Sequence, residues 1–128
     1  MLSCTIIIPT LNSGGMLEPL ISSLESQSVP PSEVIVIDSS STDNTPDEAT
    51  RLGCNLVTIP RTEFNHGRTR NLAARQAKGD VLVFMTQDAL PQSNFFFEEL
   101  LKRIDQGVAS GTYARQVPYA SARPTEVF

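Results

Sequence analysis

The sequence is poor in the residues that build disulfide frameworks, thiolate metal sites and basic surfaces. Its 128 residues include no tryptophan, two cysteines and one histidine. Cys4 and Cys54 lie far apart, which excludes a zinc site of closely spaced thiolate and imidazole ligands. We expect both cysteines to be small buried residues at the starts of strands. The net charge of -4 argues against nucleic-acid binding through a general basic surface.

Long apolar runs are also missing. No stretch approaches the roughly 18 to 20 uninterrupted apolar residues of a membrane span, and the N-terminus lacks the pattern of a signal peptide. We therefore expect no transmembrane segment and a cytoplasmic location. With 40% hydrophobic and 19% charged residues, the length suits one globular domain with a single core.

Four short runs rich in β-branched residues predict strands. Three of the runs are nearly continuous in apolar residues, the pattern of strands that are buried on both faces of a parallel sheet. The four predicted strands are residues 4–9, 33–38, 55–59 and 81–86.

Helical patterns separate these runs. Leucine and isoleucine recur at helical spacing in the first connection, and Thr45, Pro46 and Glu48 have the spacing of a capping box that starts the second helix. The third helix should bury Leu72 and the alanines that follow it. The predicted helices are residues 15–29, 45–52, 67–78 and 93–105, and residues 108–113 are a candidate fifth strand. The order predicts an α/β domain with a mostly parallel sheet and helices on both faces.

Polar residues gather in three loops, each of which follows a predicted strand: residues 9–15, 38–45 and 86–89. Ser, Thr, Asn and Asp are common in such turns as helix caps, regardless of function. However, the carboxyl ends of parallel strands meet at one edge of the sheet, where ligands bind in open α/β folds. Three polar loops at one edge therefore favour a ligand site there.

Basic residues are concentrated in one short segment, because half of the ten Lys and Arg residues lie within residues 61–78. Arg70 falls near the N-terminus of a predicted helix, where an anion such as phosphate is favoured. Arg75 and Lys78 are better explained as partners of the helix dipole at its other end. His66 is either a ligand contact or a structural residue. Asp88, at the end of an apolar strand, could bind Mg²⁺ or Mn²⁺ together with a diphosphate.

Three motifs occur in order across residues 5–91: IIIPTLN, EVIVIDSSSTDNT and HGRTRNLAARQAKGDVLVFMTQDALP. This ordered set resembles the N-terminal half of inverting family 2 glycosyltransferases, which have the GT-A fold. The fragments FNHGRTRN and TQDALP, followed by YARQVP at residues 113–118, look most like the rhamnosyltransferase-type members.

The resemblance implies a nucleotide-diphosphate sugar of the dTDP or UDP type as the donor. By the same resemblance, Asp38 would accept a hydrogen bond from the base, Arg70 would contact the base or the diphosphate, and Asp88 would hold a divalent cation, Mg²⁺ or Mn²⁺. Asp88 is the one aspartate left where the family has an Asp-x-Asp motif. The residues implied to bind the nucleotide sugar are Pro9, Thr10, Asn12, Asp38, Ser40, Arg70, Gln87 and Asp88.

The resemblance further implies a glycan or lipid-linked acceptor, a role in polysaccharide biosynthesis and a peripheral location at the cytoplasmic membrane face. An acidic general base is expected outside this chain, since none of Glu98, Glu99, Asp105 and Glu126 is a convincing base. Residues 1–116 would then be the nucleotide-sugar-binding core, and residues 117–128 an irregular tail that leads into a missing acceptor half.

A nucleotide-binding module without transferase chemistry is the alternative left open. A Rossmann dehydrogenase is disfavoured, because the loop after the first strand lacks Gly-x-Gly-x-x-Gly.

Overall fold

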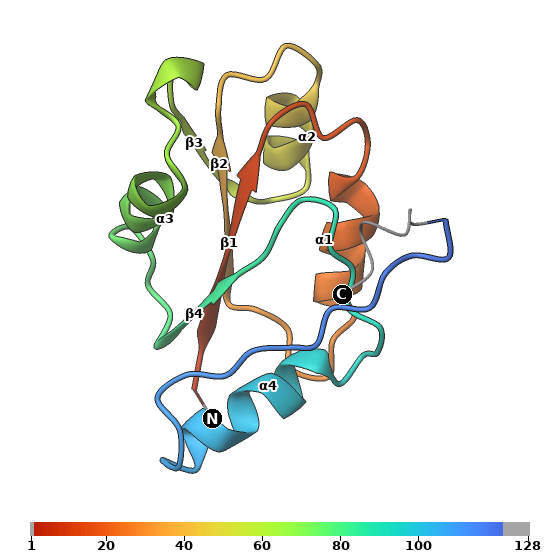
Figure 1. The fold of residues 1–128 in the computed structure, drawn as a ribbon, viewed down its shortest axis with the longest axis vertical. Coiled ribbons are helices and arrows are strands. Elements are labelled where there is room, and N and C mark those ends of the chain that lie inside the picture. Colours follow the sequence, from red (N-terminus) through yellow and green to blue (C-terminus); the bar gives the residue numbers. More distant parts are fainter. Residues whose placement is uncertain (1, 122–128) are drawn as a thin grey trace.

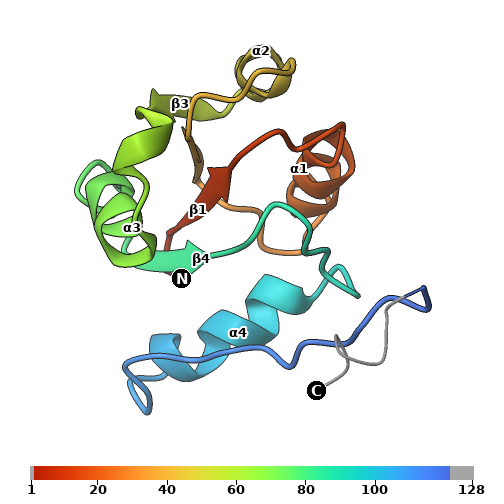
Figure 2. The same ribbon diagram turned by 45° about the horizontal axis from the view of Figure 1, so that its top comes forward.

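The chain folds into a parallel four-stranded sheet with helices on both faces (Figures 1 and 2). The computed structural model describes residues 2–121. The sheet order is β3-β2-β1-β4, and every neighbouring pair is parallel. The four predicted strands are confirmed, with ends that differ by at most two residues: β1 (Cys4–Thr10), β2 (Glu33–Asp38), β3 (Asn55–Thr58) and β4 (Val81–Phe84).

The helices divide unequally between the two faces. Three of them, α1 (Leu17–Glu25), α2 (Thr45–Arg51) and α4 (Phe96–Asp105), pack on one face, where their buried apolar side chains join those of the strands. The other face is covered by α3 (His66–Ala74), which packs on β1 and β2 and follows a short 3-10 helix, η1 (Arg61–Glu63). The predicted α/β architecture is therefore confirmed.

β1 carries a proline although it lies in the middle of the sheet. Proline has no N–H group and is unfavourable where a strand is paired on both sides. Pro9 pairs with Ile37 of β2, but on the β4 side the pairing ends earlier, at Ile7 and Phe84. The missing N–H therefore faces the side on which no strand requires it, and the sheet opens at this point.

The starts and ends of the helices differ from those predicted from the sequence. Thr45 does not form the predicted capping box, because its hydroxyl bonds Asp43 and Ser13, residues outside the helix. α3 starts earlier and ends at Ala74 instead of residue 78; its N-cap is Asn65, whose Oδ1 accepts hydrogen bonds from two amides of the first turn.

Two further predictions were wrong. Leu72 was expected inside together with the alanines that follow it, but it is 38% exposed, whereas Ala73 is buried as predicted. Residues 108–113 form no strand; the chain from 108 to 121 has no helix or strand and runs back beside α4 in both views (Figures 1 and 2). Both cysteines are buried, as expected, with Cys4 opening β1 and Cys54 directly preceding β3.

Candidate functional site

The carboxyl ends of β1 and β2 are joined by a buried hydrogen-bond network around Asp38. Thr10 pairs with Asp38 in the sheet register, and its hydroxyl donates to Asp38 Oδ1 over 2.7 Å. Ser41 donates to the same carboxylate twice, from its amide over 2.8 Å and from its hydroxyl over 2.5 Å. Asp38 has 0% relative exposure. A nucleotide could therefore reach this carboxylate only if the loop moved.

Asn12 connects the loop after β1 with the loop after β2. Its backbone has a positive φ of 47°, and its Oδ1 accepts a hydrogen bond from the Thr42 amide over 2.8 Å. The Asn12 backbone amide donates a hydrogen bond to the Ser41 hydroxyl oxygen over 2.8 Å, and the Gly14 amide donates to Asp43 over 3.2 Å. A hydrogen bond from the Thr45 hydroxyl lowers the pKa of Asp43. Thus the polar atoms of these loops mostly bind one another.

Ser40 ties the same region to the segment that follows β3. It has a positive φ of 56°, and its hydroxyl donates to the Ile59 carbonyl over 2.7 Å. Arg61 Nη2 in turn donates to the Ser40 carbonyl over 3.2 Å. The loop after β2 and η1 are therefore held together from both directions.

The loop after β4 is anchored by two side chains. The amide of Gln87 makes two hydrogen bonds to the backbone of Leu11, accepting from its N–H over 3.0 Å and donating to its carbonyl over 3.2 Å. The Tyr119 hydroxyl donates to the main-chain carbonyl of Asp88 over 2.5 Å. Asp88 itself is exposed, so its carboxylate is open to solvent.

A cavity of about 310 Å³ lies at this edge of the sheet. Of the sequence-predicted site residues, Pro9, Thr10, Arg70 and Gln87 line it, whereas the remaining four do not. The walls combine apolar side chains, hydroxyl groups and two guanidinium groups, without a carboxylate. The lining residues are Pro9, Thr10, Leu11, Ser39, Arg61, Phe64, Arg70, Thr86 and Gln87.

The two arginines of the cavity have unused donors. Arg70 Nη1 donates to the His66 carbonyl over 3.0 Å, and one Nη atom of Arg61 binds the backbone as described above. Within residues 2–121 the ion pair found is that of Arg51 with Glu18, so neither arginine of the cavity is neutralised by a carboxylate there. Since a guanidinium carries five N–H donors, most of them remain for an anion or a carbonyl group.

Sequence reasoning missed one wall of this cavity. From the sequence, Arg61 is expected only as part of the basic segment, and Phe64 has no predicted role. Neither residue belongs to a predicted strand or helix, and their position depends on how the chain passes from β3 to α3. The clue available in the sequence was the position of Arg61 and Phe64 just ahead of His66 and Arg70.

The protein supplies little for a metal ion at this edge. In the part of the chain that the structure describes, no group of three or more His, Cys, Asp or Glu residues is placed to hold a metal. A single carboxylate, that of Asp88, fits a cation whose other ligands are diphosphate oxygens and water, as is common for Mg²⁺.

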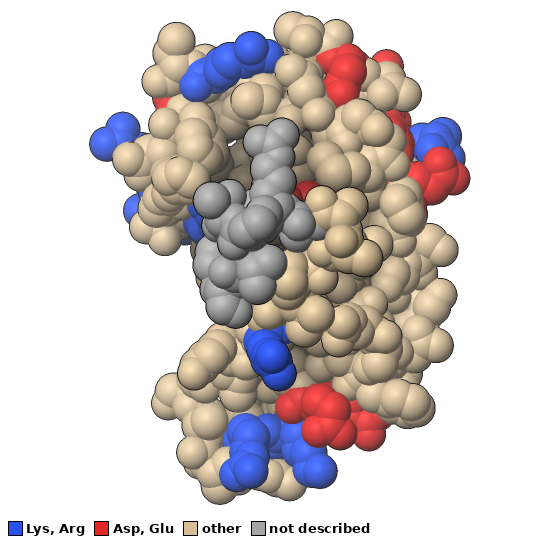
Figure 3. Space-filling model, turned by 45° about the vertical axis from the view of Figure 1, so that its right-hand side comes forward, with Lys and Arg blue, Asp and Glu red and all other residues tan. Residues whose placement is uncertain are grey.

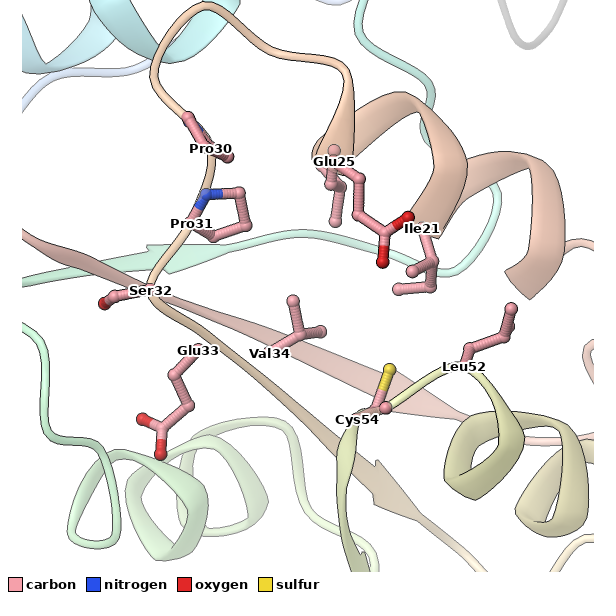
Figure 4. A pocket seen from close by; sticks show the side chains of 11 residues that line it. Ile21, Glu25, Pro30, Pro31, Ser32, Glu33, Val34, Leu52 and Cys54 are labelled. Atoms are coloured by element: carbon pink, nitrogen blue, oxygen red, sulfur yellow. The ribbon is translucent and has the colours of Figure 1, made fainter.

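A second cavity, of about 170 Å³, lies near the opposite edge of the sheet (Figure 4). Ile21, Val34 and Leu52 give it apolar walls, and its charged side chains are the carboxylates of Glu25 and Glu33. Burial, reinforced by Glu25, raises the pKa of the Cys54 thiol to about 11. This cavity therefore offers a neutral thiol and acidic groups, which do not suit a phosphate.

Three of the acidic residues considered as a general base, Glu98, Glu99 and Asp105, do not line the first cavity. Glu98 accepts a hydrogen bond from the Ser28 hydroxyl over 2.8 Å, and Asp105 accepts one from the Leu2 amide over 3.3 Å. Glu126 lies outside the described residues.

None of the helices described in residues 2–121 is long and apolar enough to cross a membrane. On the face shown in Figure 3, Lys and Arg side chains form separate groups and no continuous basic surface.

Comparisons with known proteins agree with this geometry. The family model for glycosyl transferase family 2 matches residues 5–125. The O-antigen chain rhamnosyltransferase WbaN of Salmonella anatum is 37% identical over 127 residues, which are 98% of this chain and 40% of that protein.

Two solved structures share the fold. Staphylococcus aureus TarS 1–349 superposes with a TM-score of 0.73 at 25% identity, covering 92% of this chain and 39% of that chain. The mannosyltransferase PcManGT from Pyrobaculum calidifontis, in complex with GDP-Man and Mn²⁺, has a TM-score of 0.68 at 29% identity, covering 79% and 32%.

The chain thus spans about 40% of the length of the two O-antigen chain rhamnosyltransferases that it matches. Its parallel sheet with helices on both faces is shared with solved glycosyltransferases of the GT-A fold. The family match covers nearly the whole chain, and the similarity to rhamnosyltransferases extends over most of it. This chain belongs to glycosyl transferase family 2.

Proposed function

We propose that this chain forms the donor-binding part of an inverting glycosyltransferase that uses a nucleoside-diphosphate sugar. The observation that carries the proposal is the cavity of about 310 Å³ at the carboxyl edge of the sheet, which joins apolar walls to two arginines that have no carboxylate partner within residues 2–121. The similarity to WbaN, whose name describes a rhamnosyltransferase, supports rhamnose as the sugar, and the resemblance of the sequence motifs to the family implies dTDP or UDP as its carrier.

In this proposal the cavity residues contact the donor and the loop residues hold the cavity in shape. Arg70 donates hydrogen bonds to the diphosphate, because charge-assisted bonds from a guanidinium to phosphate are strong and directional. Pro9, Thr10 and Gln87 line the nucleotide. Asp38, Asn12 and Ser40 act as positioning residues, since their polar atoms are engaged in the loops that surround the cavity.

A divalent cation belongs to the proposal, and Asp88 is the residue that would hold it. When bound, the cation would neutralise negative charge on the departing diphosphate. The chain's own contribution is to present the exposed Asp88 carboxylate on a loop that Gln87 and Tyr119 anchor.

The transfer itself is a displacement with inversion. The acceptor hydroxyl loses its proton to a general base, its oxygen forms a bond to the anomeric carbon, and the bond from that carbon to the diphosphate oxygen breaks. Arg70 stabilises the nucleoside diphosphate that leaves. None of the nine lining residues carries a carboxylate, so we assign the base to another part of the full-length protein, together with the site for a glycan or lipid-linked acceptor.

Calorimetric titration with UDP and dTDP, with Mn²⁺ or with a chelator, tests the donor site. We expect Arg70→Gln to weaken binding about tenfold, the effect of one lost charge-assisted hydrogen bond. Arg68→Gln is the matched control, because Arg68 is exposed on the same helix and does not line the cavity. Asp88→Asn should remove the gain in affinity that Mn²⁺ provides. Equal affinity with metal and with chelator in the unchanged protein would contradict the cation's role.

The absence of a carboxylate from the cavity lining also favours a second candidate, a nucleotide-binding module without transferase chemistry. The two are separated by incubating the full-length protein with dTDP-rhamnose and acceptor glycan. Release of dTDP that depends on the acceptor supports the transferase. Tight dTDP binding without such release would support the module.

A further inference from the structure

One wall of the cavity comes from the connection between β3 and α3. It carries Arg61, within η1, and Phe64, directly after it, and both side chains line the cavity. Phe64 is 39% exposed, although it is a large apolar residue beside a hollow. His66 packs against it edge to face, with ring centroids 5.0 Å apart and an interplanar angle of 77°. His66 therefore packs against the phenyl ring of Phe64, while part of the ring surface remains exposed.

An uncovered aromatic ring in such a cavity offers a stacking surface for a flat ring. Single exposed apolar side chains are common and need no function. Phe64 differs because it shares its cavity with Pro9 and Leu11, also apolar, and with hydrogen-bond donors. Aromatic side chains bind bases by stacking with little regard to which base is present. Stacking on Phe64 would thus supply affinity, and selectivity would have to come from polar groups.

The polar groups of the cavity favour a base rich in carbonyl oxygens. Arg61 and Arg70 only donate hydrogen bonds, and the lining contains no carboxylate to accept one from an amino group. Arg61 is held in place by its bond to the Ser40 carbonyl, with its other N–H groups free of any ion pair in the described residues. The Thr10 hydroxyl donates to Asp38, so its lone pairs are left to accept from a ring N–H.

Uracil and thymine meet these conditions better than cytosine. Each carries two carbonyl oxygens around one ring N–H, whereas cytosine has an amino group, which donates, in place of one carbonyl. An amino group that faces a guanidinium places two donors against each other and leaves both without a partner.

We propose that Phe64 and Arg61 determine donor specificity: Phe64 stacks on the base, and Arg61 donates to a base carbonyl, so that the site selects a diketo pyrimidine over cytosine. This inference rests on the proposed donor-binding function and adds to it the two residues that recognise the base.

Calorimetric titration of the full-length protein with UDP, dTDP and CDP tests the proposal. We expect UDP and dTDP to bind about tenfold more tightly than CDP, the scale of one base-specific contact. Arg61→Gln should bring this ratio towards one. Phe64→Leu should weaken all three about tenfold and leave the ratio unchanged, while Phe64→Tyr, which keeps the stacking surface, should retain the affinity.

Matched controls are available outside the cavity. Arg68→Gln removes a neighbouring exposed arginine, and Phe95→Leu removes another exposed phenylalanine; neither should change affinity or ratio. If none of the three nucleotides binds the unchanged protein, the donor-binding function itself fails. If they bind but Arg61→Gln weakens UDP and CDP equally, Arg61 serves the diphosphate and base selection is overturned. Unchanged affinities in Phe64→Leu would overturn the stacking.

Discussion

The buried carboxylate of Asp38 leads to a prediction that separates a structural role from a nucleotide contact. It accepts three hydrogen bonds, from the Thr10 hydroxyl and from the amide and hydroxyl of Ser41, and its side chain has no exposed surface. If these bonds are its role, replacing the charge must weaken the fold before it affects any ligand. The informative substitution is Asp38→Asn, which keeps the size and removes the charge.

The magnitude follows from the number of bonds. The asparagine oxygen can still accept from the Ser41 amide, while its NH₂ group turns to the two hydroxyls as a donor. Hydrogen bonds to charged groups contribute about 1.5–3 kcal/mol and neutral ones about 1 kcal/mol, so three such exchanges cost about 3 kcal/mol in total. For a domain of this size, each kcal/mol lowers the melting temperature by about 4 °C. We expect a decrease of about 12 °C by this scale.

The assay is thermal unfolding followed by circular dichroism, with Asp88→Asn as the matched control. Asp88 lies on the same edge of the sheet but is exposed, so the same substitution there should move the melting temperature by no more than about 2 °C, as for most surface changes. The reasoning is refuted if Asp38→Asn melts with the unchanged protein and yet loses nucleotide binding. That result would show that Asp38 contacts the nucleotide directly, as the family resemblance implied.

Two further predictions concern the sheet and the second cavity. A Cβ at Gly79 would lie 2.7 Å from the Thr5 amide nitrogen, so Gly79→Ala should cost about 2–3 kcal/mol by overpacking; chemical denaturation measures it, and Gly111→Ala, in open space, should change nothing. The raised pKa of Cys54, about 11 against an ordinary 9.0, predicts alkylation by iodoacetamide at pH 8 about a hundredfold slower in the folded than in the unfolded protein. Because the folded state holds this proton more tightly, the free energy of unfolding should fall as the pH rises from about 9 towards 11. An alkylation rate equal in both states would contradict this.

The sheet could be predicted from the sequence because its signal is local. The run at residues 33–38 matches β2 to the residue, since isoleucine and valine there are buried on both faces. Local sequence patterns gave wrong predictions where a residue's hydrogen-bond or packing partner is distant in the sequence. The Thr45 hydroxyl had the spacing of a helix cap, but Ser13, 32 residues away, binds it instead. Leu72 and Ala73 were both predicted to face inward, but only the small Ala73 is buried against the sheet.

The site was predictable only at the ends of the strands. Pro9 and Thr10 were placed correctly because the end of an apolar run marks the edge of the sheet. The sequence contains no comparable signal for the course of the segment between β3 and α3, so the position of Phe64 in the cavity wall was not predicted. Nor could the sequence distinguish the enclosed Asp38 from the exposed Asp88, because both lie near the ends of apolar runs. In the structure Asp38 is the last residue of β2 and is bonded by Thr10 and Ser41, whereas Asp88 lies beyond the end of β4.

The double hydrogen bond between Gln87 and Leu11 has a mechanical consequence. A side-chain amide carries the same N–H and C=O pair as a peptide group, and Gln87 uses both, beyond the last backbone bond between Met85 and Ile7. The Gln87 side chain therefore adds a connection between the chain after β4 and the chain after β1, beyond the point where the backbone pairing of these strands ends. One side of the cavity is thereby tied to β1, so the entropy of ordering that side is lost during folding and not when a ligand binds.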